Sequence, residues 1–566
     1  MNILGINSFF GHPSVAITEN EKLSFAIEEE RLTKIKGGKS YSPYVFQLPF
    51  KSIFKGLETL DLTVDDIDMI GYSFNKWSYL FHGLVGNLTR SRFSSTREKL
   101  SAFNNLLGLK NNLKATYDWF AYMEERLPVN KLNKIKFKAL DHHLCHAASS
   151  FFCSDFSESL ILTADGSGEG FATTISVGNR NKINFVKKFP IPHSLGFLYS
   201  FFTRHLGFDP FMDEYKIMGL ASYGKPSFIE KLKEIIYFDN NGDYKINKKL
   251  LSAIYKLFGP PRKYSDPITD RHKDIAHSLQ KVLEEALANL VLHYIKVTKQ
   301  TKLCLAGGVA LNCVANARLA EIVGNENIFV QPAANDAGTA VGACALLNAK
   351  YGNWQNPQIK YKNMYLGTGY KQEYILGLLK RYNLPFEKFG SRDLERIIAK
   401  YLYEGKVIGI YRDKMEFGPR ALGNRSIIAT PQNTDIQEKL NIIKGREMFR
   451  PIAPLVLEED FDIYFTGVKN EYMLFTNKVK DNMKRLIPGV VHIDDTSRVQ
   501  VVSKNKNIFI YNILCEFKKL SGVSVLVNTS LNFKGQPIIE HPSDAIASLY
   551  SSGLEILVLG NFILKK

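Results

Sequence analysis

Two histidines separated by one helical turn are the first residues of this sequence whose types and spacing indicate chemistry. In the segment 141–146, Asp-His-His-Leu-Cys-His, His142 and His146 occupy positions i and i+4. On a helix both imidazoles would project from one face and could share a cation, whereas His143 would point elsewhere. The alternative is a helix that begins after Asp141, with histidines hydrogen-bonded in the core. Spacing alone leaves both interpretations open.

Two carboxylates at glycine-containing turns could complete a site with this histidine pair. Asp165 begins the run Asp-Gly-Ser-Gly-Glu, and Asp336 lies in Asn-Asp-Ala-Gly. A mixed shell of histidines and carboxylates with open positions suits Fe(II), Mn(II) or Zn(II), and the open positions would accept phosphate oxygens. Residue types do not choose among these metals. We place Fe(II) first, with Mn(II) and Zn(II) as the alternatives. The predicted ligands are His142, His146, Asp165 and Asp336.

A second group of candidate residues is basic. The segments 415–426 and 444–451 place five cations among glycines, prolines and apolar residues, namely Arg420, Arg425, Lys444, Arg446 and Arg450. A buried charge costs several kcal/mol without a partner, and bidentate phosphate or carboxylate binding supplies one. This pattern favours an anion pocket over internal salt bridges. The polar run 528–532 follows an apolar strand predicted at 523–527, but taken alone it is best interpreted as an ordinary turn.

The elements that must position these residues follow an α/β pattern. Alternation and β-branched content predict two similar sets of strands, at 2–7, 14–18 and 23–28, and again at 159–164, 171–177 and 183–189. Asp165–Gly168 is predicted to form a turn after the first strand of the second set. Two copies of strand, glycine-containing turn and hairpin, separated by helical sequence, indicate a duplicated architecture of the actin and sugar-kinase kind.

Further along, a helix is predicted at 275–298, after the cap-like Asp274, and two strand–loop–helix units follow it. Their strands are predicted at 302–305 and 327–330. Glycines between a buried strand and a helix let backbone amides and the helix N-terminus meet an anion. The segment 352–363, rich in Gly, Pro, Asn and Tyr, is the linker candidate, and a second α/β domain is predicted after it.

Composition limits the class of protein. A chain of 566 residues with 45% hydrophobic and 23% charged residues can form two or three domains and is too apolar for disorder. No window has the roughly 18 consecutive apolar residues of a membrane span, and the first residues lack a secretory pattern. Six cysteines without a C-x-x-C pair indicate reduced thiols in a cytoplasmic protein. We interpret the net charge of +17 as serving phosphate-bearing small ligands rather than nucleic acid.

Together these segments resemble the O-carbamoyltransferase family, which includes nodulation enzymes and the tailoring enzymes of cephamycin, novobiocin and tobramycin biosynthesis. The resemblance runs nearly end to end. Its motifs are Gly11-His12, 28–31 with Lys36, 141–148, 165–169, 214–221, 307–316, 332–338, 417–426, 446–454, 495–500 and 528–532. The resemblance implies an actin-like (ASKHA-type) carbamoyl-transfer domain at 1–355 with the metal site, followed by a YrdC-like α/β domain at 365–566.

The resemblance also implies a two-step reaction. The C-terminal domain would make carbamoyl adenylate from carbamoyl phosphate and ATP, bound as Mg-ATP, and would release phosphate and pyrophosphate. The N-terminal domain would pass the carbamoyl group to a hydroxyl of a small-molecule natural product, such as an antibiotic, or of a sugar. By resemblance His12 is the general base, and Lys36 polarises the carbamoyl oxygen or contacts phosphate. Arg420 and Arg450 are the catalytic cations.

The remaining residues implied by the resemblance bind substrate and nucleotide. They are Gly307, Gly308, Asn312, Arg425, Ser426, Lys444, Arg446, Arg498, Asn528 and Ser530. Gly37-Gly38 and Met448 depart from the family pattern, which leaves the identity of the acceptor open. We expect no membrane partner and no nucleic-acid partner, and a homodimer is compatible with the sequence.

Three alternatives stay open. The positive charge and the shared folds are compatible with tRNA threonylcarbamoylation, but the domain order and the arginine-rich segments resemble the small-molecule family. Hydrogenase-maturation carbamoyl transfer is disfavoured because the C-x-x-C zinc motifs of that family are absent from this sequence. A non-catalytic nucleotide sensor on an actin-like fold is the alternative from a different class.

Overall fold

The computed structural model describes residues 1–8, 10–38, 48–75, 135–352, 359 and 361–566. They form a mixed α/β protein, as the sequence predicts. Two compact units are present, and each is built from separate stretches of the chain. The first unit contains residues 1–197, 297–310 and 329–361, and the second contains 198–296, 311–328 and 362–566.

The first sheet of unit 1 is built from the N-terminal strands. These are β1 (Asn2–Asn7), β2 (Ser14–Glu19), β3 (Lys22–Glu28), β4 (Met69–Tyr72) and β5 (Lys136–Ala139), in the order β3-β2-β1-β4-β5. β1 is antiparallel to β2 and parallel to β4. The bounds of β1, β2 and β3 agree with the predicted strands to within one residue.

The second sheet of unit 1 repeats this topology. Its strands are β6 (Glu158–Gly168), β7 (Phe171–Asn179), β8 (Lys182–Pro190), β11 (Leu303–Ala306) and β12 (Ile328–Val330), in the order β12-β11-β6-β7-β8. β6 is antiparallel to β7 and parallel to β11. In both sheets the first three strands form an antiparallel group. A fourth strand, β4 or β11, then pairs with the first strand of its group, and the fifth strand, β5 or β12, lies beside the fourth. The duplicated pattern of the sequence therefore recurs in the strand order.

Two local predictions need correction. Asp165–Gly168, predicted as a turn, belongs to β6, although the pairing with β7 shifts register between Ala164 and Gly168. This irregularity explains why the sequence looks like a turn there. The predicted cap Asp274 lies inside α11 (Asp270–Thr298), because that helix begins one turn earlier.

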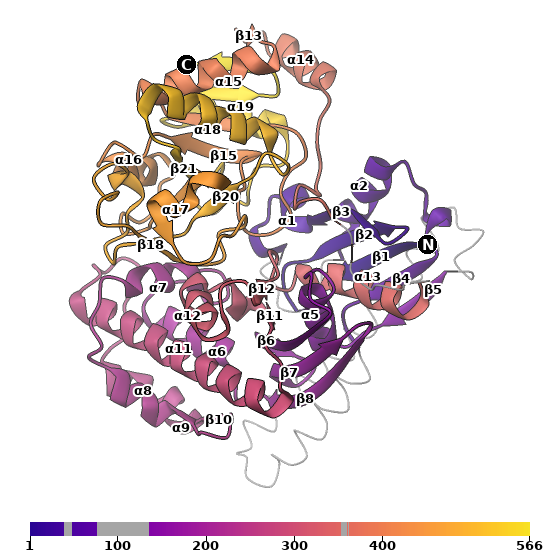
Figure 1. Cartoon of the computed structure of the whole chain (residues 1–566), viewed down its shortest axis with the longest axis vertical. Helices are drawn as coiled ribbons and strands as arrows, with labels where there is room; N and C mark the ends of the chain where they lie inside the picture. Colours follow the sequence, from indigo (N-terminus) through magenta and orange to yellow (C-terminus); the bar gives the residue numbers. More distant parts are fainter. Residues whose placement is uncertain (9, 39–47, 76–134, 353–358, 360) are drawn as a thin grey trace. The chain divides into compact units, whose positions relative to one another are not determined.

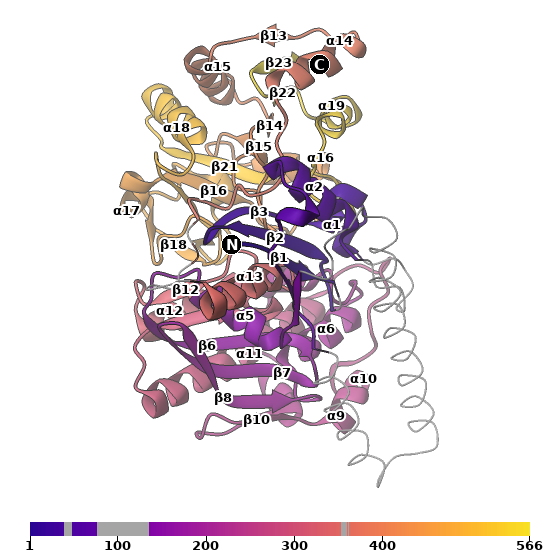
Figure 2. The same cartoon turned by 90° about the vertical axis from the view of Figure 1, so that its right-hand side faces the viewer.

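Two helices lie between the sheets of unit 1. α13 (Gly338–Tyr351) packs on β1, β2 and β4, α5 (His142–Phe151) packs on β6 and β11, and the two helices pack against each other (Figures 1 and 2). A Cβ atom on Gly342 would overlap the carbonyl oxygen of Cys145, so glycine is required where the helices meet. Smaller elements of this unit are α1 (Glu29–Thr33), η1 (Lys36–Gly38), α2 (Phe50–Leu60) and η2 (Val64–Asp66).

Unit 2 is built on an eight-stranded sheet in the order β13-β23-β22-β14-β15-β21-β16-β20. Its strands are β13 (Glu387–Lys388), β14 (Ile408–Tyr411), β15 (Arg425–Ala429), β16 (Ala453–Leu457), β20 (Gln500–Val502), β21 (Val525–Ser530), β22 (Ile556–Leu559) and β23 (Phe562–Lys565). Helices that pack on it include α15 (Ser391–Tyr403), α18 (Ile508–Ser521) and α19 (Pro542–Ser551). The apolar strand interiors and these helices form one buried core.

The remaining elements of unit 2 are mostly helical. Its further helices are α6 (Leu195–His205), α7 (Glu214–Ala221), α8 (Ile229–Ile235), α9 (Lys248–Ser252), α10 (Ile254–Phe258), α11, η4 (Gly308–Leu311), α12 (Cys313–Val323), α14 (Gln372–Arg381), α16 (Ile436–Ile443), η5 (Glu458–Asp460), α17 (Phe461–Tyr464) and η6 (Pro488–Val490), of which α6, α11 and η4 run across a boundary between the units. Its small sheets pair β9 (Ile236–Phe238) with β10 (Tyr244–Ile246), and β17 (Phe465–Thr466) with β18 (Asn477–Val479) and β19 (Thr496–Ser497).

The second unit is discontinuous in sequence. It groups 198–296 and 311–328 with the C-terminal residues. The predicted domains, 1–355 and 365–566, are instead continuous in sequence. Those domain limits stay a prediction. Residues 353–358 and 360 of the predicted linker lie outside the described residues. Within the described ranges, no helix has both the length and the apolar content that crossing a bilayer requires.

Candidate metal centre and anion pocket

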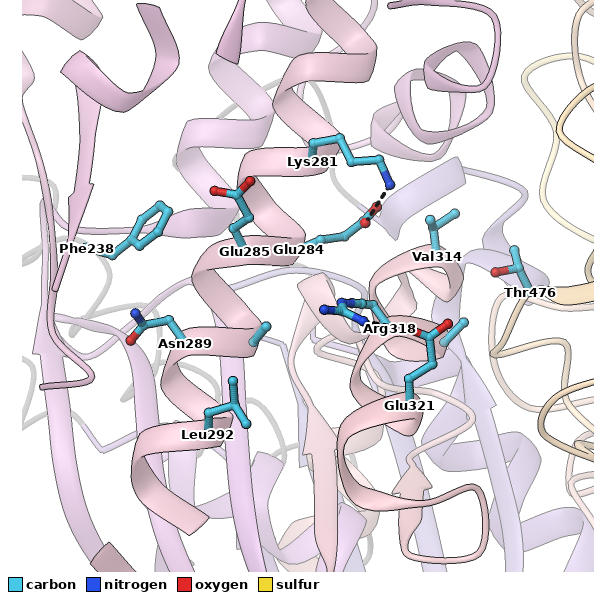
Figure 3. Close-up of a pocket in the computed structure, with 12 residues that line it drawn as sticks. Phe238, Lys281, Glu284, Glu285, Asn289, Leu292, Val314, Arg318, Glu321 and Thr476 are labelled. Atoms are coloured by element: carbon cyan, nitrogen blue, oxygen red, sulfur yellow. Dashed lines mark hydrogen bonds and ion pairs between the residues drawn. The ribbon is translucent and has the colours of Figure 1, made fainter. Parts of the chain in front are cut away.

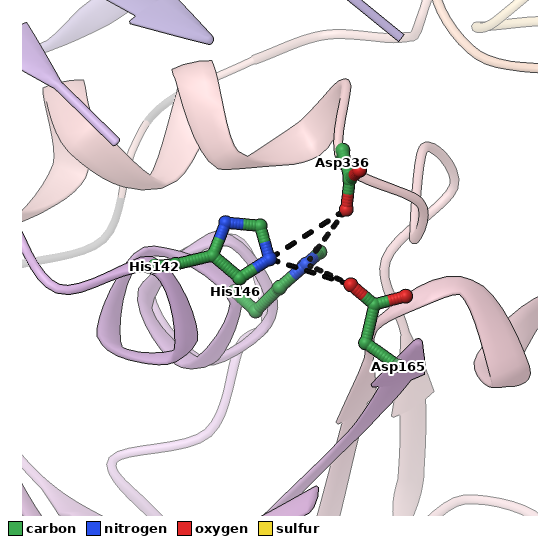
Figure 4. Close-up of side chains that lie close together, drawn as sticks. All are labelled: His142, His146, Asp165 and Asp336. Atoms are coloured by element: carbon green, nitrogen blue, oxygen red, sulfur yellow. Dashed lines mark hydrogen bonds and ion pairs between the residues drawn. The ribbon is translucent and has the colours of Figure 1, made fainter. Parts of the chain in front are cut away.

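Four side chains of unit 1 converge on one point (Figure 4). The Nε2 atom of His142 lies 3.3 Å from Oδ2 of Asp165 and 3.6 Å from Oδ1 of Asp336. The Nε2 atom of His146 lies 3.4 Å from the same two oxygens. One ligand atom from each residue fits within 4.8 Å of the others. The structure thus brings together all four predicted metal ligands.

Local structure explains this convergence. Asp141 caps α5 by accepting a hydrogen bond of 2.8 Å from the backbone N–H of Leu144, so α5 begins at His142 and its first turn presents both histidines. Asp165 lies in the irregular end of β6, and Asp336 lies just before α13. The second oxygen of Asp165 accepts a hydrogen bond of 3.1 Å from the N–H of Gly308.

The electrostatics of this group fit a cation. Burial and the neighbouring Asp165 raise the pKa of Asp336, which shows that the two carboxylates repel each other. Burial would lower the pKa of His146, but Asp165 and Asp336 outweigh it and raise that pKa to about 9. In the buried group, His146 Nε2 and Asp336 Oδ1 have no hydrogen-bond partner. A divalent cation would satisfy these atoms and replace the protons, so the residues present fit a metal.

Gly168 is expected to be indispensable to this geometry. A Cβ atom there would overlap the ring of His142 and lie 3.0 Å from Cδ2 of His143. We therefore expect Gly168→Ala to displace His142 and to weaken metal binding by about 10- to 100-fold, as loss of a ligand-orienting contact does. Calorimetric titration with Mn(II) measures the effect. The control is Gly377→Ala, because a Cβ at that helical position meets nothing within 4 Å, and an unchanged Mn(II) affinity in Gly168→Ala would contradict the prediction.

His12, the predicted base, and Lys36, the predicted lysine, both act electrostatically on the carboxylate of Glu30. Asn7 donates hydrogen bonds to the carbonyl oxygens of Gly11 (2.7 Å) and His12 (3.0 Å), which fixes this turn. A Cβ atom on Gly11 would lie 2.7 Å from Oδ2 of Asp336, so the turn adjoins the metal ligands. Burial would raise the pKa of Glu30, but Arg31, His12 and Lys36, with the N–H of Gly37, lower it. The catalytic roles of His12 and Lys36 stay predictions.

Glu169 is a buried residue of this region to which the sequence analysis assigns no role. Its carboxylate accepts hydrogen bonds from the backbone N–H groups of Asn75 (2.5 Å) and His142 (3.0 Å). Burial and the nearby Asp141 raise its pKa to about 8. The only sequence signal is its place at the end of the run that begins with Asp165, because both partners are distant backbone groups.

A cluster of arginines forms in unit 2. Burial, together with the nearby Arg498 and Arg450, lowers the pKa of Arg420 to about 10. Burial lowers the pKa of Arg446 to about 9, again with contributions from Arg450 and Arg498. Among the described residues no carboxylate lies within ion-pair distance of Arg420, Arg446 or Arg498, and buried donors of Arg420 and Arg446 lack partners. The cluster brings together Arg420, Arg446 and Arg450 of the predicted anion pocket, and an anionic ligand would supply the missing partners. The pocket itself stays a prediction.

Residues of α7 adjoin the arginine cluster, which the sequence analysis did not anticipate. Tyr215 lies under the guanidinium of Arg450, with 4.7 Å to the ring centre. Lys216 pairs at 2.9 Å with both Asp213 and Glu447, and Glu447 lies 3.9 Å from Arg450. These contacts join segments more than 200 residues apart in the sequence, and no local pattern could reveal them.

Lys444 and Ser530 also lie together. The ammonium of Lys444 donates to Oγ of Ser530 at 3.2 Å and to the carbonyl and side-chain oxygens of Asn532 at 2.8 and 2.9 Å. It also donates to the carbonyl oxygen of Ser530. Ser530 donates in turn to Oδ1 of Asn532 at 2.6 Å. Lys444 thus fixes the end of β21.

Other predicted binding residues have protein partners in this structure. Arg425 stacks on Tyr411 and donates to the backbone carbonyl oxygens of Arg412, Asn424, Thr368 and Asp413. Oγ of Ser426 accepts a hydrogen bond of 2.9 Å from the N–H of Gly423.

Asn312 and Gly307 are held in the same way. Asn312 caps α12 through the N–H of Ala315 and exchanges two hydrogen bonds with the side chain of Gln280. The N–H of Gly307 donates to the carbonyl oxygen of Ala334 at 2.8 Å. The amide N–H of Gly307 therefore has a protein acceptor, and the amide N–H of Gly308 donates to Asp165, a candidate metal ligand.

An open cavity of about 680 Å³ lies elsewhere in unit 2, between α11 and α12 (Figure 3). Two ion pairs lie within its lining, Lys281 with Glu284 at 3.0 Å and Arg318 with Glu321 at 2.7 Å. None of the predicted site residues lines it. The candidate site therefore rests on the chemistry of its residues and not on cavity size.

Comparison with known proteins identifies the family of this chain. Residues 2–345 match the family described as Carbamoyltransferase N-terminus, and residues 399–566 match Carbamoyltransferase C-terminus. Nodulation protein NolNO of Sinorhizobium fredii is 33% identical over all of this chain and 80% of its own length. An uncharacterized Synechocystis protein, sll1178, is also 33% identical, over all of this chain and 97% of its own.

Among solved structures, component A of (R)-2-hydroxyglutaryl-CoA dehydratase from Acidaminococcus fermentans aligns with 62% of this chain and all of its own. The sequence identity is 15% and the TM-score is 0.33, which is too low to support a conclusion. The two family matches follow one another along the chain, and their ranges include the four candidate metal ligands and the arginine cluster. The chain belongs to the carbamoyltransferase family.

Proposed function

We propose that this protein is an ATP-dependent O-carbamoyltransferase that acts on a hydroxyl of a small-molecule natural product or sugar. The observation that carries the proposal is the cluster of Arg420, Arg446 and Arg498, whose like charges lie close together without carboxylate partners. Such a cluster suits two highly anionic substrates, carbamoyl phosphate and ATP. Family membership supports the identity of the group that is transferred.

In the proposed first step, carbamoyl adenylate forms at the arginines. Water releases phosphate from carbamoyl phosphate and leaves carbamate, whose oxygen attacks the α-phosphorus of ATP while pyrophosphate leaves. Arg420 and Arg450 lower the repulsion between carbamate and the α-phosphate. Arg446 and Arg498 bind the phosphates, while Lys444 and Ser530 hold the edge of the pocket at the end of β21.

In the proposed second step, the acceptor hydroxyl attacks the carbamoyl carbon of the adenylate. The bond to AMP breaks, and AMP leaves with its electron pair. His12 accepts the proton of the hydroxyl, and Lys36 polarises the carbamoyl oxygen. His142, His146, Asp165 and Asp336 would hold Fe(II), Mn(II) or Zn(II). Such a cation supplies positive charge to the phosphate of the leaving group.

We also propose the finer fold assignments that the family resemblance implies. The repeated strand order of the two sheets in unit 1 supports an actin-like domain at 1–355. The C-terminal residues 365–566, with the arginine cluster, would be the YrdC-like part. Under this proposal the segments 198–296 and 311–328 add residues such as Tyr215 and Lys216 to the C-terminal pocket.

The experiment that tests the proposed function omits the acceptor. Purified protein is incubated with carbamoyl phosphate, Mg-ATP and Fe(II) or Mn(II), and pyrophosphate and carbamoyl adenylate are measured by mass spectrometry. We expect both products, and only when carbamoyl phosphate and ATP are present together. Failure to detect either product in the complete mixture would contradict the proposal. ATP cleavage that does not require carbamoyl phosphate would contradict it as well.

A further inference from the structure

The loop that carries Arg420 lies between β14 and β15 and has no regular secondary structure. It contains two glycines with left-handed backbone, Gly418 (φ 109°) and Gly423 (φ 114°). Backbone amide and carbonyl groups buried in such a loop cannot pair within a helix or sheet, so they need other partners. The position of Arg420 therefore depends on what satisfies this backbone.

The amide groups of the loop converge on one carboxylate. Oε1 of Glu416 accepts hydrogen bonds from the backbone N–H groups of Leu422 (2.7 Å), Asn424 (2.8 Å) and Arg425 (3.2 Å). These three donors all follow Arg420, whereas Glu416 precedes it. A single oxygen therefore closes the loop around Arg420.

The carbonyl groups of the loop are held from the other side. Gln500 and the hydroxyl of Tyr365 donate to the carbonyl oxygen of Leu422, at 2.9 and 2.7 Å. Asn528 donates to the carbonyl oxygen of Ala421 at 2.9 Å and to Oε1 of Gln500 at 2.9 Å. Asn528, predicted to orient substrate, thus donates both N–H groups of its amide inside this network.

Glu416 is an unusual group to bury in this position. Its side chain is 0% exposed, its second oxygen Oε2 has no hydrogen-bond partner, and among the described residues no cation lies within ion-pair distance of it. A buried carboxylate without a cation is costly, and the three amide donors are what offset that cost. Such a carboxylate makes sense if it holds the loop rigidly. A loop that is already ordered binds an anion without losing further conformational entropy.

We propose that Glu416 is a positioning residue that fixes the loop of Arg420 in the geometry needed to bind the anionic substrate. The inference rests on the proposed function, because carbamoyl phosphate is the anion concerned. Glu416 itself faces the loop backbone and does not touch substrate. Its effect passes through the three amides to Arg420.

Two substitutions separate the charge of Glu416 from its shape. Glu416→Gln keeps the volume and one acceptor oxygen, and its amide would occupy the place of Oε2. Glu416→Ala leaves three buried N–H groups unpaired. Misplacing a binding group by about 1 Å costs up to about 100-fold, so we expect affinity for carbamoyl phosphate to fall about 100-fold in Glu416→Ala and about 10-fold in Glu416→Gln. The matched control is Glu395→Gln, which removes another buried carboxylate of unit 2, one held by Asn512 at 3.0 Å.

The test measures binding of carbamoyl phosphate and of inorganic phosphate to the full chain by calorimetry, and pyrophosphate release under steady state. In Glu416→Gln we expect the KM for carbamoyl phosphate to rise while the thermal midpoint stays that of Glu395→Gln. Partial recovery in Glu416→Gln relative to Glu416→Ala distinguishes positioning from general loss of structure. If Glu416→Ala does not fold, Glu416→Gln decides alone.

Wild-type affinity for carbamoyl phosphate in Glu416→Gln, and in Glu416→Ala where it folds, would overturn the inference. Wild-type protein that binds carbamoyl phosphate without releasing pyrophosphate would contradict the proposed function, and the binding measurements would still decide the role of Glu416. Wild-type protein that binds neither carbamoyl phosphate nor phosphate would contradict both.

Discussion

Replacing Arg420 with alanine is expected to abolish measurable formation of carbamoyl adenylate. Arg420 lies beside Arg450 and Arg498 with a buried donor that lacks a partner, so the anionic substrates are its natural counter-charge. Removing one preorganised donor from a site of developing charge costs about 10²- to 10³-fold in rate. We expect a loss of at least that size in pyrophosphate release from carbamoyl phosphate and ATP, followed by mass spectrometry or a coupled assay.

The matched control for this variant is Arg318→Ala. Arg318 is an exposed arginine of α12 that pairs with Glu321 at 2.7 Å, and an exposed ion pair contributes little to stability. This variant should release pyrophosphate at the wild-type rate. A further control is the metal affinity of Arg420→Ala, which should equal that of wild type because the metal ligands belong to unit 1. If Arg420→Ala releases pyrophosphate within a factor of two of the wild-type rate, the proposed role of Arg420 in adenylate formation is contradicted.

Local signals made the convergence of the four candidate metal ligands predictable. The i, i+4 spacing of His142 and His146 holds only if a helix begins at the right residue, and Asp141 is a strong cap that determines this start. Alternation likewise defined β1, β2 and β3, because one-residue slips would turn their apolar side chains to the wrong face. Asp165 and Asp336 follow buried segments directly, so their positions depend on short stretches of sequence.

The arginine cluster was only partly predictable, because residues of the same type have different partners. Arg420 and Arg425 are five residues apart in one motif, and Nε of each is buried without a hydrogen-bond partner. The Nη atoms of Arg425 nevertheless donate to backbone carbonyl oxygens, whereas Arg420 lies among other arginines. Burial and the start of β15 decide this difference, and neither can be read from composition. Lys216 and Glu447 are 231 residues apart, and their contact follows from the discontinuous build of unit 2.

Substituting a metal ligand is expected to separate the two steps of the proposed reaction. His146→Ala removes one of four atoms that lie within 4.8 Å of one another, and it leaves Asp165 and Asp336 facing each other without that imidazole. Loss of residues that merely orient ligands costs about 10- to 100-fold in metal affinity, so loss of a ligand should cost more than about 100-fold. We expect carbamoyl transfer to a hydroxyl acceptor to be lost while pyrophosphate release persists.

The measurements are metal content after dialysis, calorimetric titration with Mn(II), and pyrophosphate release without acceptor. His143→Gln is the matched control, because His143 lies in the same helix but contacts Thr163 at 2.8 Å instead of the carboxylates. Its pKa is lowered to about 3 by burial and by His142, so it is neutral and an uncharged replacement keeps the local charge. Retained Mn(II) affinity in His146→Ala would contradict the metal assignment. Equal loss of pyrophosphate release in His146→Ala and Arg420→Ala would instead contradict the separation of the two steps, because a metal ligand of unit 1 would then be needed to form the adenylate.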